Sequence, residues 1–184
     1  LSEEQRVEPE DIQLSIDLRI QAIAYKALKS AVLSYQATSG SAMVVDVHTG
    51  EVLAMVNSPS FNPNDMRDAQ PYKRRNRAIT DLFEPGSTLK PLAILAGLDH
   101  GVIKADDTIN TYPGWMRLGG SLVKDTRNHG EMTLREILKV SSNMGVAKIS
   151  QMLPKEYLVG LYQKVGFGED TGTMMVGESS GLFY

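Results

Sequence analysis

The run of residues 83–91, Phe-Glu-Pro-Gly-Ser-Thr-Leu-Lys-Pro, constrains the fold of this chain more than any other stretch. Its Pro-Gly pair ends whatever element comes before it. The residues that follow predict a buried helix that ends at Gly101, because they carry leucines at helical spacing: Leu89, Leu92, Leu95 and Leu98. We therefore expect Ser87 and Lys90 in the first turns of that helix. Residues three apart share a helix face, so the two side chains can meet.

A serine and a lysine in this arrangement suit nucleophilic catalysis. A serine hydroxyl is a weak nucleophile until a base takes its proton, and lysine can be that base where desolvation or positive neighbours favour its neutral form. The positive end of the helix lies beside both side chains, and the backbone N–H of Ser87 is a candidate oxyanion donor. The alternative is a helix-capping serine followed by a solvated lysine, and spacing alone does not separate the two.

A second Ser-x-x-Lys match, Ser121 to Lys124, predicts something different. Gly119 and Gly120 just before it indicate a hairpin turn. On a strand, residues three apart point to opposite faces, so these two side chains should not meet. Residues 60–62 also fit a Ser-x-Asn pattern, but they precede the serine helix and fall in a predicted loop, so we assign them no role.

Composition excludes several classes of protein. The 184 residues are enough for one domain with a sizeable core, and 22% of them are charged, with a formal net charge of -3. Basic residues do not outnumber acidic ones, which argues against a nucleic-acid partner. The absence of cysteine excludes a disulfide framework and thiolate metal sites. No signal peptide or apolar run of about 20 residues occurs, so we expect any membrane anchor to lie outside this chain.

The first part of the chain predicts a linker, a helix and a hairpin. Residues 1–13 are polar and acidic, as in a linker from a preceding module. A helix over 15–37, capped by Ser15 or Asp17, should face the core with one apolar stripe: Ile20, Ala24, Ala27, Leu28, Ala31 and Tyr35. Two β-rich runs around His48-Thr49-Gly50 predict a hairpin over 41–57, with His48 as a turn residue.

The rest of the chain alternates between connections and helices. We expect irregular connections over 57–80 and over 102–112. The first contains a basic run, which is either solvated or a contact for an anion or a partner. A hairpin is predicted over 115–125. One helix should start at a capping box opened by Thr133. Another should run over 154–165.

Ser141-Ser142-Asn143 interrupts two helical runs between those predicted helix starts. Such side chains compete with the helix for backbone hydrogen bonds, so the break has a packing or a functional reason. Acyl transfer needs a nucleophile, a base, a proton relay and oxyanion donors. Ser87 and Lys90 fill the first two roles, and Ser141 can carry the proton to the leaving nitrogen. The Asn143 amide can bind a substrate carbonyl or hold the lysine, and we expect Ser87, Lys90 and Ser141 to converge in one cleft.

In order and at about the same spacing, residues 83–91 and 141–143 resemble the first and second active-site motifs of the penicillin-binding proteins. The resemblance runs from about residue 14 to the end of the chain and includes the 40–51 hairpin and Gly177-Glu178-Ser179-Ser180-Gly181. Within that family, the chain is most similar to the class B division transpeptidases.

The resemblance implies a fold, an activity and partners. The fold is α/β (α+β), with an antiparallel sheet flanked by helices as in penicillin-binding transpeptidases and serine β-lactamases. The activity is that of a D,D-transpeptidase that crosslinks peptidoglycan stem peptides at the septum, in which Ser87 attacks the D-Ala-D-Ala bond and is acylated by β-lactams. The family uses no metal or organic cofactor. It implies a periplasmic domain anchored in the inner membrane, with divisome proteins and a lipid-linked glycosyltransferase as partners.

One family motif, Lys-Ser/Thr-Gly, does not occur in these 184 residues. The family places it on a later strand that binds the substrate carboxylate. We therefore expect 14–184 to be the N-terminal portion of a transpeptidase domain, with an incomplete sheet and little or no activity of its own. Two alternatives stay open: a serine β-lactamase, for which Glu178 is the available deacylation candidate, and a non-catalytic binding or scaffold fragment.

Overall fold

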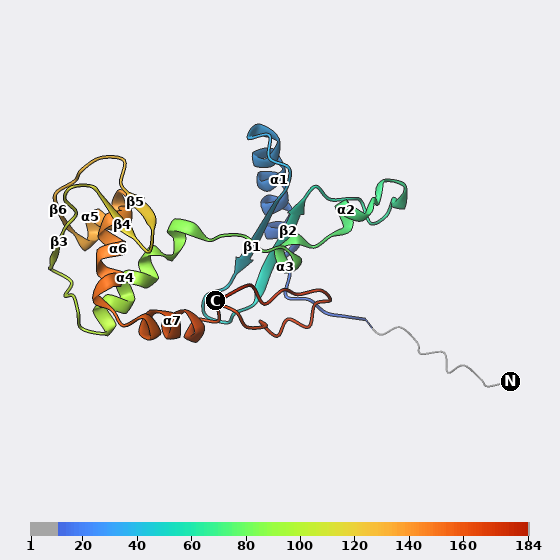
Figure 1. The fold of residues 1–184 in the computed structure, drawn as a ribbon. Coiled ribbons are helices and arrows are strands. Elements are labelled where there is room, and N and C mark those ends of the chain that lie inside the picture. The colour runs from blue at the N-terminus through green and yellow to red at the C-terminus, as the bar shows by residue number, and fades with distance from the viewer. Residues whose placement is uncertain (1–10, 184) are drawn as a thin grey trace. The chain divides into compact units, whose positions relative to one another are not determined.

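The computed structural model describes residues 11–183, and the chain divides into two compact units (Figure 1). Unit 1 extends to Asp81 and includes Met175–Ser179, and unit 2 contains Leu82–Met174 and the residues from Ser180 onward. All but the last three residues of the predicted linker at 1–13 lie outside the described residues.

Unit 1 is built on one helix and one hairpin. Helix α1 (Leu18–Ser34) packs against strands β1 (Gly40–Val45) and β2 (Val52–Ser58), which pair antiparallel (Figure 1). The predicted hairpin is therefore confirmed. In its turn the Asp46 carboxylate accepts the backbone N–H of His48 at 2.8 Å, so His48 is a turn residue as expected.

The N-terminal end of α1 covers the outer edge of β2. Asp17, one of the two predicted caps, accepts hydrogen bonds from the first N–H groups of the helix. The Gln21 side chain then donates to the Met55 carbonyl and accepts from the Met55 N–H, both at 2.8 Å. A single amide side chain thus satisfies a strand edge as a neighbouring strand would.

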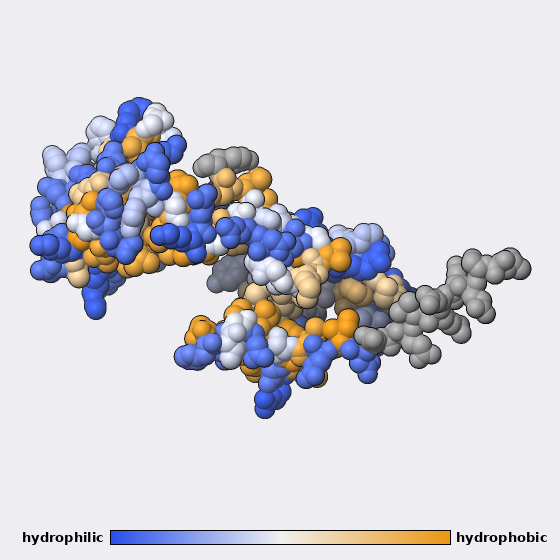
Figure 2. All heavy atoms as spheres, turned by 90° about the horizontal axis from the view of Figure 1, so that it is seen from below, coloured by the Kyte–Doolittle hydropathy of each residue, from blue (hydrophilic) through white to orange (hydrophobic). Residues whose placement is uncertain are grey.

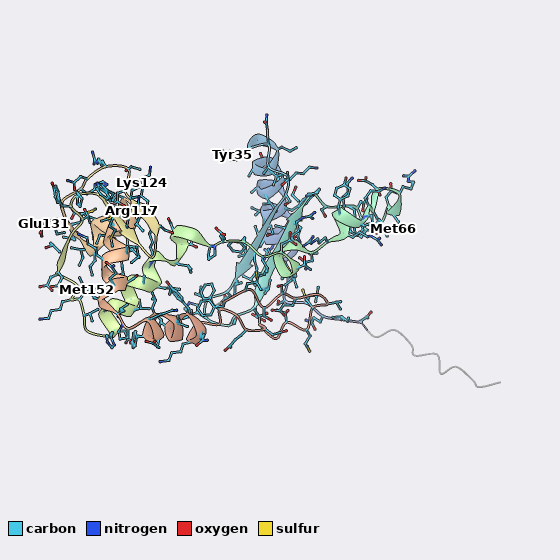
Figure 3. The ribbon with its side chains drawn as sticks, viewed as in Figure 1. Tyr35, Met66, Arg117, Lys124, Glu131 and Met152 are labelled. Atoms are coloured by element: carbon cyan, nitrogen blue, oxygen red, sulfur yellow. The ribbon has the colours of Figure 1, made fainter. Side chains whose placement is uncertain are left out.

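The predicted core stripe of α1 is wrong at Ala27, Ala31 and Tyr35, which are exposed. Tyr35 projects from the C-terminal end of the helix and is 85% exposed (Figure 3). The half-buried row keeps Ile20, Ala24 and Leu28 of the predicted stripe and adds Val32. Leu28 and Val32 lie against Gly40 of β1. A Cβ at Gly40 would be 3.0 Å from a carbon of each. Among the described residues the helix packs against a sheet of two strands, and it therefore buries a narrow row rather than a broad stripe.

The connection over 57–80 contains more regular structure than predicted. It holds three short helical turns: η1 (Met66–Asp68), α2 (Pro71–Arg74) and α3 (Arg77–Thr80). The side chain of Asn57 anchors the last of them, because its Oδ1 accepts the Ala78 N–H at 3.0 Å. Propensity did not reveal these turns, since each is only three or four residues long.

The basic run in this connection pairs with acids of its own unit. Lys73 forms an ion pair with Asp68, and Arg75 forms one with Asp81 at 2.6 Å. Arg77 lies 3.9 Å from the same Asp81 carboxylate. These pairs neutralise part of the run within unit 1, but the Lys73 and Arg77 side chains are only 19% and 13% exposed, so the expectation of a solvated run is wrong for these two residues.

Unit 2 contains four helices, a 3-10 turn and two small antiparallel sheets, and α4 packs against both α6 and α7. Strand β3 pairs with β6, and β4 pairs with β5. In chain order the elements are η2 (Gly86–Leu89), α4 (Lys90–Asp99), β3 (Thr108–Asn110), β4 (Trp115–Leu118), β5 (Ser121–Lys124), β6 (Glu131–Thr133), α5 (Leu134–Lys139), α6 (Asn143–Met152) and α7 (Lys155–Lys164).

Most predicted elements of unit 2 are confirmed. The hairpin turn has Gly119 at φ 54° and Gly120 at φ 83°, the left-handed pair that a two-residue turn favours. Helix α5 begins at the predicted capping box, with Thr133 and Glu136 bonding each other's backbone. The prediction for 102–112 is wrong, because β3 lies within it. Three residues are too few to show strand periodicity, and the pairing with β6 defines them.

The core of unit 2 is a single apolar cluster, made by Ile94, Ile103, Ile109, Met132, Leu134, Ile137 and Ile149. Helix α4 contributes to it, but not through the leucine stripe, since Leu95 is 48% exposed. Its buried face carries small residues around Gly97. A Cβ at Gly97 would lie 2.9 Å from Ile149, so the missing side chain lets α6 approach α4 closely.

Hydrophobic residues also reach the surface in both units, as the orange atoms of Figure 2 show. Val47 in unit 1 is 90% exposed and Phe83 in unit 2 is 83% exposed. Within residues 11–183, every helix is too short or too polar to cross a bilayer.

Candidate active site

Ser87 lies on an exposed turn at the start of the α4 segment. The preceding Gly86 has φ 59°, a left-handed conformation that glycine adopts at little cost and that redirects the chain into the turn. Ser87 belongs to the 3-10 turn η2, and Lys90 is the first residue of α4, with its N–H bonded to the Ser87 carbonyl. The predicted helix start is confirmed, with a tighter first turn than expected.

The Lys90 ammonium connects this turn to the second motif, 51 residues later in the chain. Its Nζ donates to the Ser141 carbonyl, to Ser141 Oγ at 2.8 Å and to Asn143 Oδ1 at 2.7 Å. The structure therefore brings Lys90, Ser141 and Asn143 together. Ser87 is three residues from Lys90 in the chain, but it is not an acceptor in these three bonds.

Ser141 has a backbone conformation that glycine usually adopts. Its φ is 55°, and it directly follows the C-cap of α5. The Ser141 N–H bonds the Leu138 carbonyl at 3.1 Å, and the Ser142 N–H bonds the Ile137 carbonyl at 2.9 Å. These two bonds form a Schellman motif, whose left-handed position is normally glycine. The Ser-Ser-Asn break is thus the C-terminal cap of one helix and the start of the next.

The start of α6 is held from two sides. Ser142, only 1% exposed, is the N-cap, and its Oγ accepts the Gly145 N–H at 2.9 Å. The carboxylate of Asp125, just after β5, accepts from Ser142 Oγ at 2.6 Å and from the N–H groups of Asn143 and Met144 at 2.6 and 3.1 Å. Sequence reasoning missed Asp125, because a carboxylate in a polar loop carries no signal of a contact 17 residues away.

Asn143 uses both atoms of its amide. Its oxygen accepts from Lys90, and its Nδ2 donates to the carbonyl of Lys124 at 2.9 Å. Of the two roles considered for this amide, holding the lysine is the one present in the structure. Lys124 ends β5 (Figure 3), with Ser121 at the opposite end of that strand. The second Ser-x-x-Lys match therefore lies on a strand, as predicted, and supplies a backbone carbonyl to the site.

The surroundings of Lys90 change its proton affinity. Partial burial lowers the pKa of the Lys90 ammonium, because desolvation disfavours the charged form. The negative charge of Asp125 acts in the opposite direction and is the weaker effect. A lysine with a lowered pKa holds a larger neutral fraction at a given pH, which a general base requires.

A cavity of about 160 Å³ opens beside the second motif, and its walls are Lys124, Asp125, Thr126, His129, Val140, Ser141 and Asn143. Ser141 and Asn143 of the second motif face this open space, whereas Ser87 and Lys90 are not among the residues that line it. Among the described residues, no group of three or more histidine, aspartate or glutamate side chains is placed to hold a metal ion.

Residues 40–183 match the family model of the penicillin-binding protein transpeptidase domain. The chain belongs to this family. Peptidoglycan D,D-transpeptidase FtsI of Escherichia coli strain K12 is 46% identical over 173 residues, which are 94% of this chain and 29% of that relative. The probable peptidoglycan D,D-transpeptidase PenA of Neisseria flavescens is 40% identical over 94% of this chain and 43% of its own length.

Solved structures agree with this family and with the predicted α+β fold. A crystal structure of a peptidoglycan glycosyltransferase from Burkholderia ambifaria aligns with a TM-score of 0.80 at 37% identity, over 91% of this chain and 49% of that one. The apo transpeptidase domain of penicillin-binding protein 3 from Burkholderia pseudomallei aligns at 0.79, with 35% identity over 91% and 46%. This transpeptidase family chain thus spans less than half the length of these relatives.

Proposed function

We propose that the protein carrying this chain is a peptidoglycan D,D-transpeptidase that crosslinks stem peptides in septal cell-wall synthesis and is acylated by β-lactams. The observation that carries the proposal is the bonding of Lys90 to Ser141 and Asn143, with Ser87 one turn before it. The identity of 46% to Escherichia coli FtsI supports it. Residues 14–184 would supply the N-terminal portion of the transpeptidase domain.

Each site residue has one role in this mechanism. Ser87 Oγ attacks the carbonyl carbon between the two D-alanines and forms an ester, while the C–N bond to the last D-alanine breaks. Lys90 takes the hydroxyl proton, and Ser141 passes a proton to the departing amine. Asn143 holds Lys90 in place. The Ser87 N–H, at the start of η2, is the proposed oxyanion donor from this chain.

The acyl-enzyme then has two fates. The amine of a neighbouring stem peptide attacks the ester carbonyl, which forms the crosslink and frees Ser87. Attack by water instead gives carboxypeptidase hydrolysis. A β-lactam enters by the first step, when Ser87 opens its ring amide. The ring nitrogen stays attached to the acyl group, so the ester persists.

The site residues also suit a serine β-lactamase, the nearest alternative enzyme. That activity needs a group that activates water against the acyl-enzyme, and neither Lys90 nor Ser141 is free of a role in acylation. The relatives named above are transpeptidases, which favours crosslinking. A non-catalytic scaffold is the alternative of another class, since the Lys-Ser/Thr-Gly motif is absent from these residues.

Location and partners follow from the same proposal. Such a transpeptidase would act in the periplasm from an inner-membrane anchor outside this chain. Its partners would be divisome proteins and a lipid-linked glycosyltransferase that supplies nascent glycan.

Labelling with a fluorescent penicillin tests the assignment of the nucleophile. In the complete protein that carries this chain, Ser87→Ala should abolish covalent labelling, because the ester oxygen is lost. Ser121→Ala is the matched control, since Ser121 opens the second Ser-x-x-Lys match on β5. Its labelling should equal that of the unmodified protein. Equal loss from both substitutions, or labelling that survives Ser87→Ala, would contradict the assignment.

A further inference from the structure

Asp125 makes a group of contacts that its place in the chain does not explain. The residue is half-buried, and its own N–H bonds the Gly114 carbonyl at 2.9 Å, which fixes it at the base of the β4–β5 hairpin. Its two carboxylate oxygens accept three hydrogen bonds, and all three come from residues 142–144. An acid of one element thus caps the N-terminus of a helix in another.

The capped segment is the one that presents Ser141. Both the Ser141 carbonyl and its Oγ accept from Lys90 Nζ, and they do so from a left-handed backbone with φ 55°. A left-handed residue other than glycine costs about 1–2 kcal/mol, so the surrounding structure must hold it. The Schellman bonds hold it from the α5 side. On the α6 side, the three bonds of Asp125 hold the next residues.

We propose that Asp125 is a positioning residue for the proposed acylation, holding residues 142–144 so that Ser141 and Asn143 keep their oxygens on Lys90. Asp125 touches neither Ser87 nor the reacting atoms, so it acts through the second motif. This assignment rests on the proposed function, and it adds a residue from the β4–β5 hairpin to the site.

Asp125 has a second effect through its charge. Besides Lys90 and Asp125, the titratable residues that line the cavities next to the site are Lys124 and His129. Of these residues, Asp125 is the one whose negative charge raises the pKa of Lys90, against the larger lowering by desolvation. Removing that charge while keeping an oxygen acceptor should therefore lower the pKa of Lys90 further.

Two substitutions separate the two effects in the complete protein. Asp125→Ala removes all three acceptor bonds, and we expect penicillin acylation to slow by about a hundredfold, the effect of misplacing a reacting group by about 1 Å. Asp125→Asn keeps one oxygen for the backbone N–H groups. Its acylation should persist. The acylation rate rises with pH as Lys90 loses its proton, and in Asp125→Asn this rise should occur at lower pH.

Asp46→Ala is the matched control. Asp46 also accepts two backbone N–H bonds, from His48 and Thr49, but in the turn of unit 1. Its acylation rate should stay within about twofold of the unmodified protein, as expected for a surface turn. If Asp125 has a merely structural role, both Asp125 variants should have a lower melting temperature, and the pH dependence of their acylation rate should be unchanged.

A titration without substrate distinguishes this inference from the proposed function. The ¹³Cε resonance of Lys90, assigned by its loss in Lys90→Arg, should titrate at lower pH in Asp125→Asn than in the unmodified protein. If the unmodified protein is not acylated, the proposed function fails. The shift of the Lys90 titration in Asp125→Asn still tests whether Asp125 acts on Lys90. An unmoved Lys90 titration, or acylation of Asp125→Ala within twofold of the unmodified protein, would overturn the inference.

Discussion

At the scale of single residues, the site carries strain where its proposed chemistry takes place. Ser141 is a non-glycine residue in the left-handed region and occupies the position of a Schellman motif that normally belongs to glycine. Gln36 and Met174 share a positive φ, but neither bonds to the site. The serine side chain at this position supplies the Oγ that Lys90 contacts, which is the physical reason to keep a strained residue there.

Substitution of Ser141 should separate stability from activity. Ser141→Gly and Ser141→Ala lose the same hydroxyl, and both should lose most penicillin acylation because the proposed proton relay is gone. They differ only in the backbone, since glycine adopts φ 55° without strain. We expect the free energy of unfolding of Ser141→Gly to be about 1 kcal/mol higher than that of Ser141→Ala, as measured by urea denaturation. Equal stability of the two variants would show that the left-handed conformation costs nothing here.

At the scale of elements, close helix packing builds unit 2. Helices α5 and α6 approach each other at Gly145, where a Cβ would lie 2.7 Å from two carbons of the fully buried Ile137. Helices α4 and α6 approach in the same way at Gly97. The contact at Gly97 packs α4, whose first residue is Lys90, against α6, whose first residue is Asn143. Small residues at these positions therefore let the helices that carry the site pack closely.

Two helical glycines provide a matched test of this packing. Gly145→Ala should destabilise the protein by about 1–3 kcal/mol, because Ile137 has a branched, buried side chain that cannot move aside. Gly160→Ala, in α7, meets nothing within 4 Å and should be neutral or stabilising by up to about 1 kcal/mol. Thermal unfolding of both variants measures the difference. A Gly145→Ala protein as stable as Gly160→Ala would contradict the close approach of α5 and α6.

At the scale of the whole molecule, the sheet of unit 1 has one covered edge and one open edge. In unit 1, β2 has α1 along its outer edge, whereas β1 pairs with β2 alone within residues 11–183. Met43 of β1 is opposite Met55, whose backbone groups bond Gln21, so the backbone N–H and C=O of Met43 point away from β2. Met43 and Val45 are 43% and 44% exposed on this strand. An open apolar edge is a template for another strand.

The 184-residue chain by itself should therefore self-associate through β1. Met43→Pro removes the outward N–H without breaking a bond to β2, so it should shift the chain toward monomer. Met43→Leu keeps both that N–H and an apolar side chain, and it should associate like the unmodified chain. Sedimentation velocity measures the association. A monomeric unmodified chain, or equal association of the two variants, would rule out β1 as the contact.

The sequence by itself determined the longer helices, the two predicted hairpins and the two motifs of the site. Local rules sufficed for the 119–120 turn, the Thr133 capping box and both long hairpins, because turn and cap chemistry acts over a few residues. The same holds for the resemblance at 83–91 and 141–143, which was enough for the family and for the fold class. The roles of Ser87, Lys90, Ser141 and Asn143 remain proposals from that sequence reasoning.

Only the tertiary structure decided which faces are buried and what holds the site. The periodicity of α1 and α4 did not locate their packed faces, because burial depends on which neighbours a helix meets and how closely glycine lets them approach. Likewise, β3 exists only through its pairing with β6. Asp125 shows the same limit at the site. A carboxylate acquires its role from hydrogen-bond partners that folding brings within 3 Å, and no pattern along the chain records which partners those are.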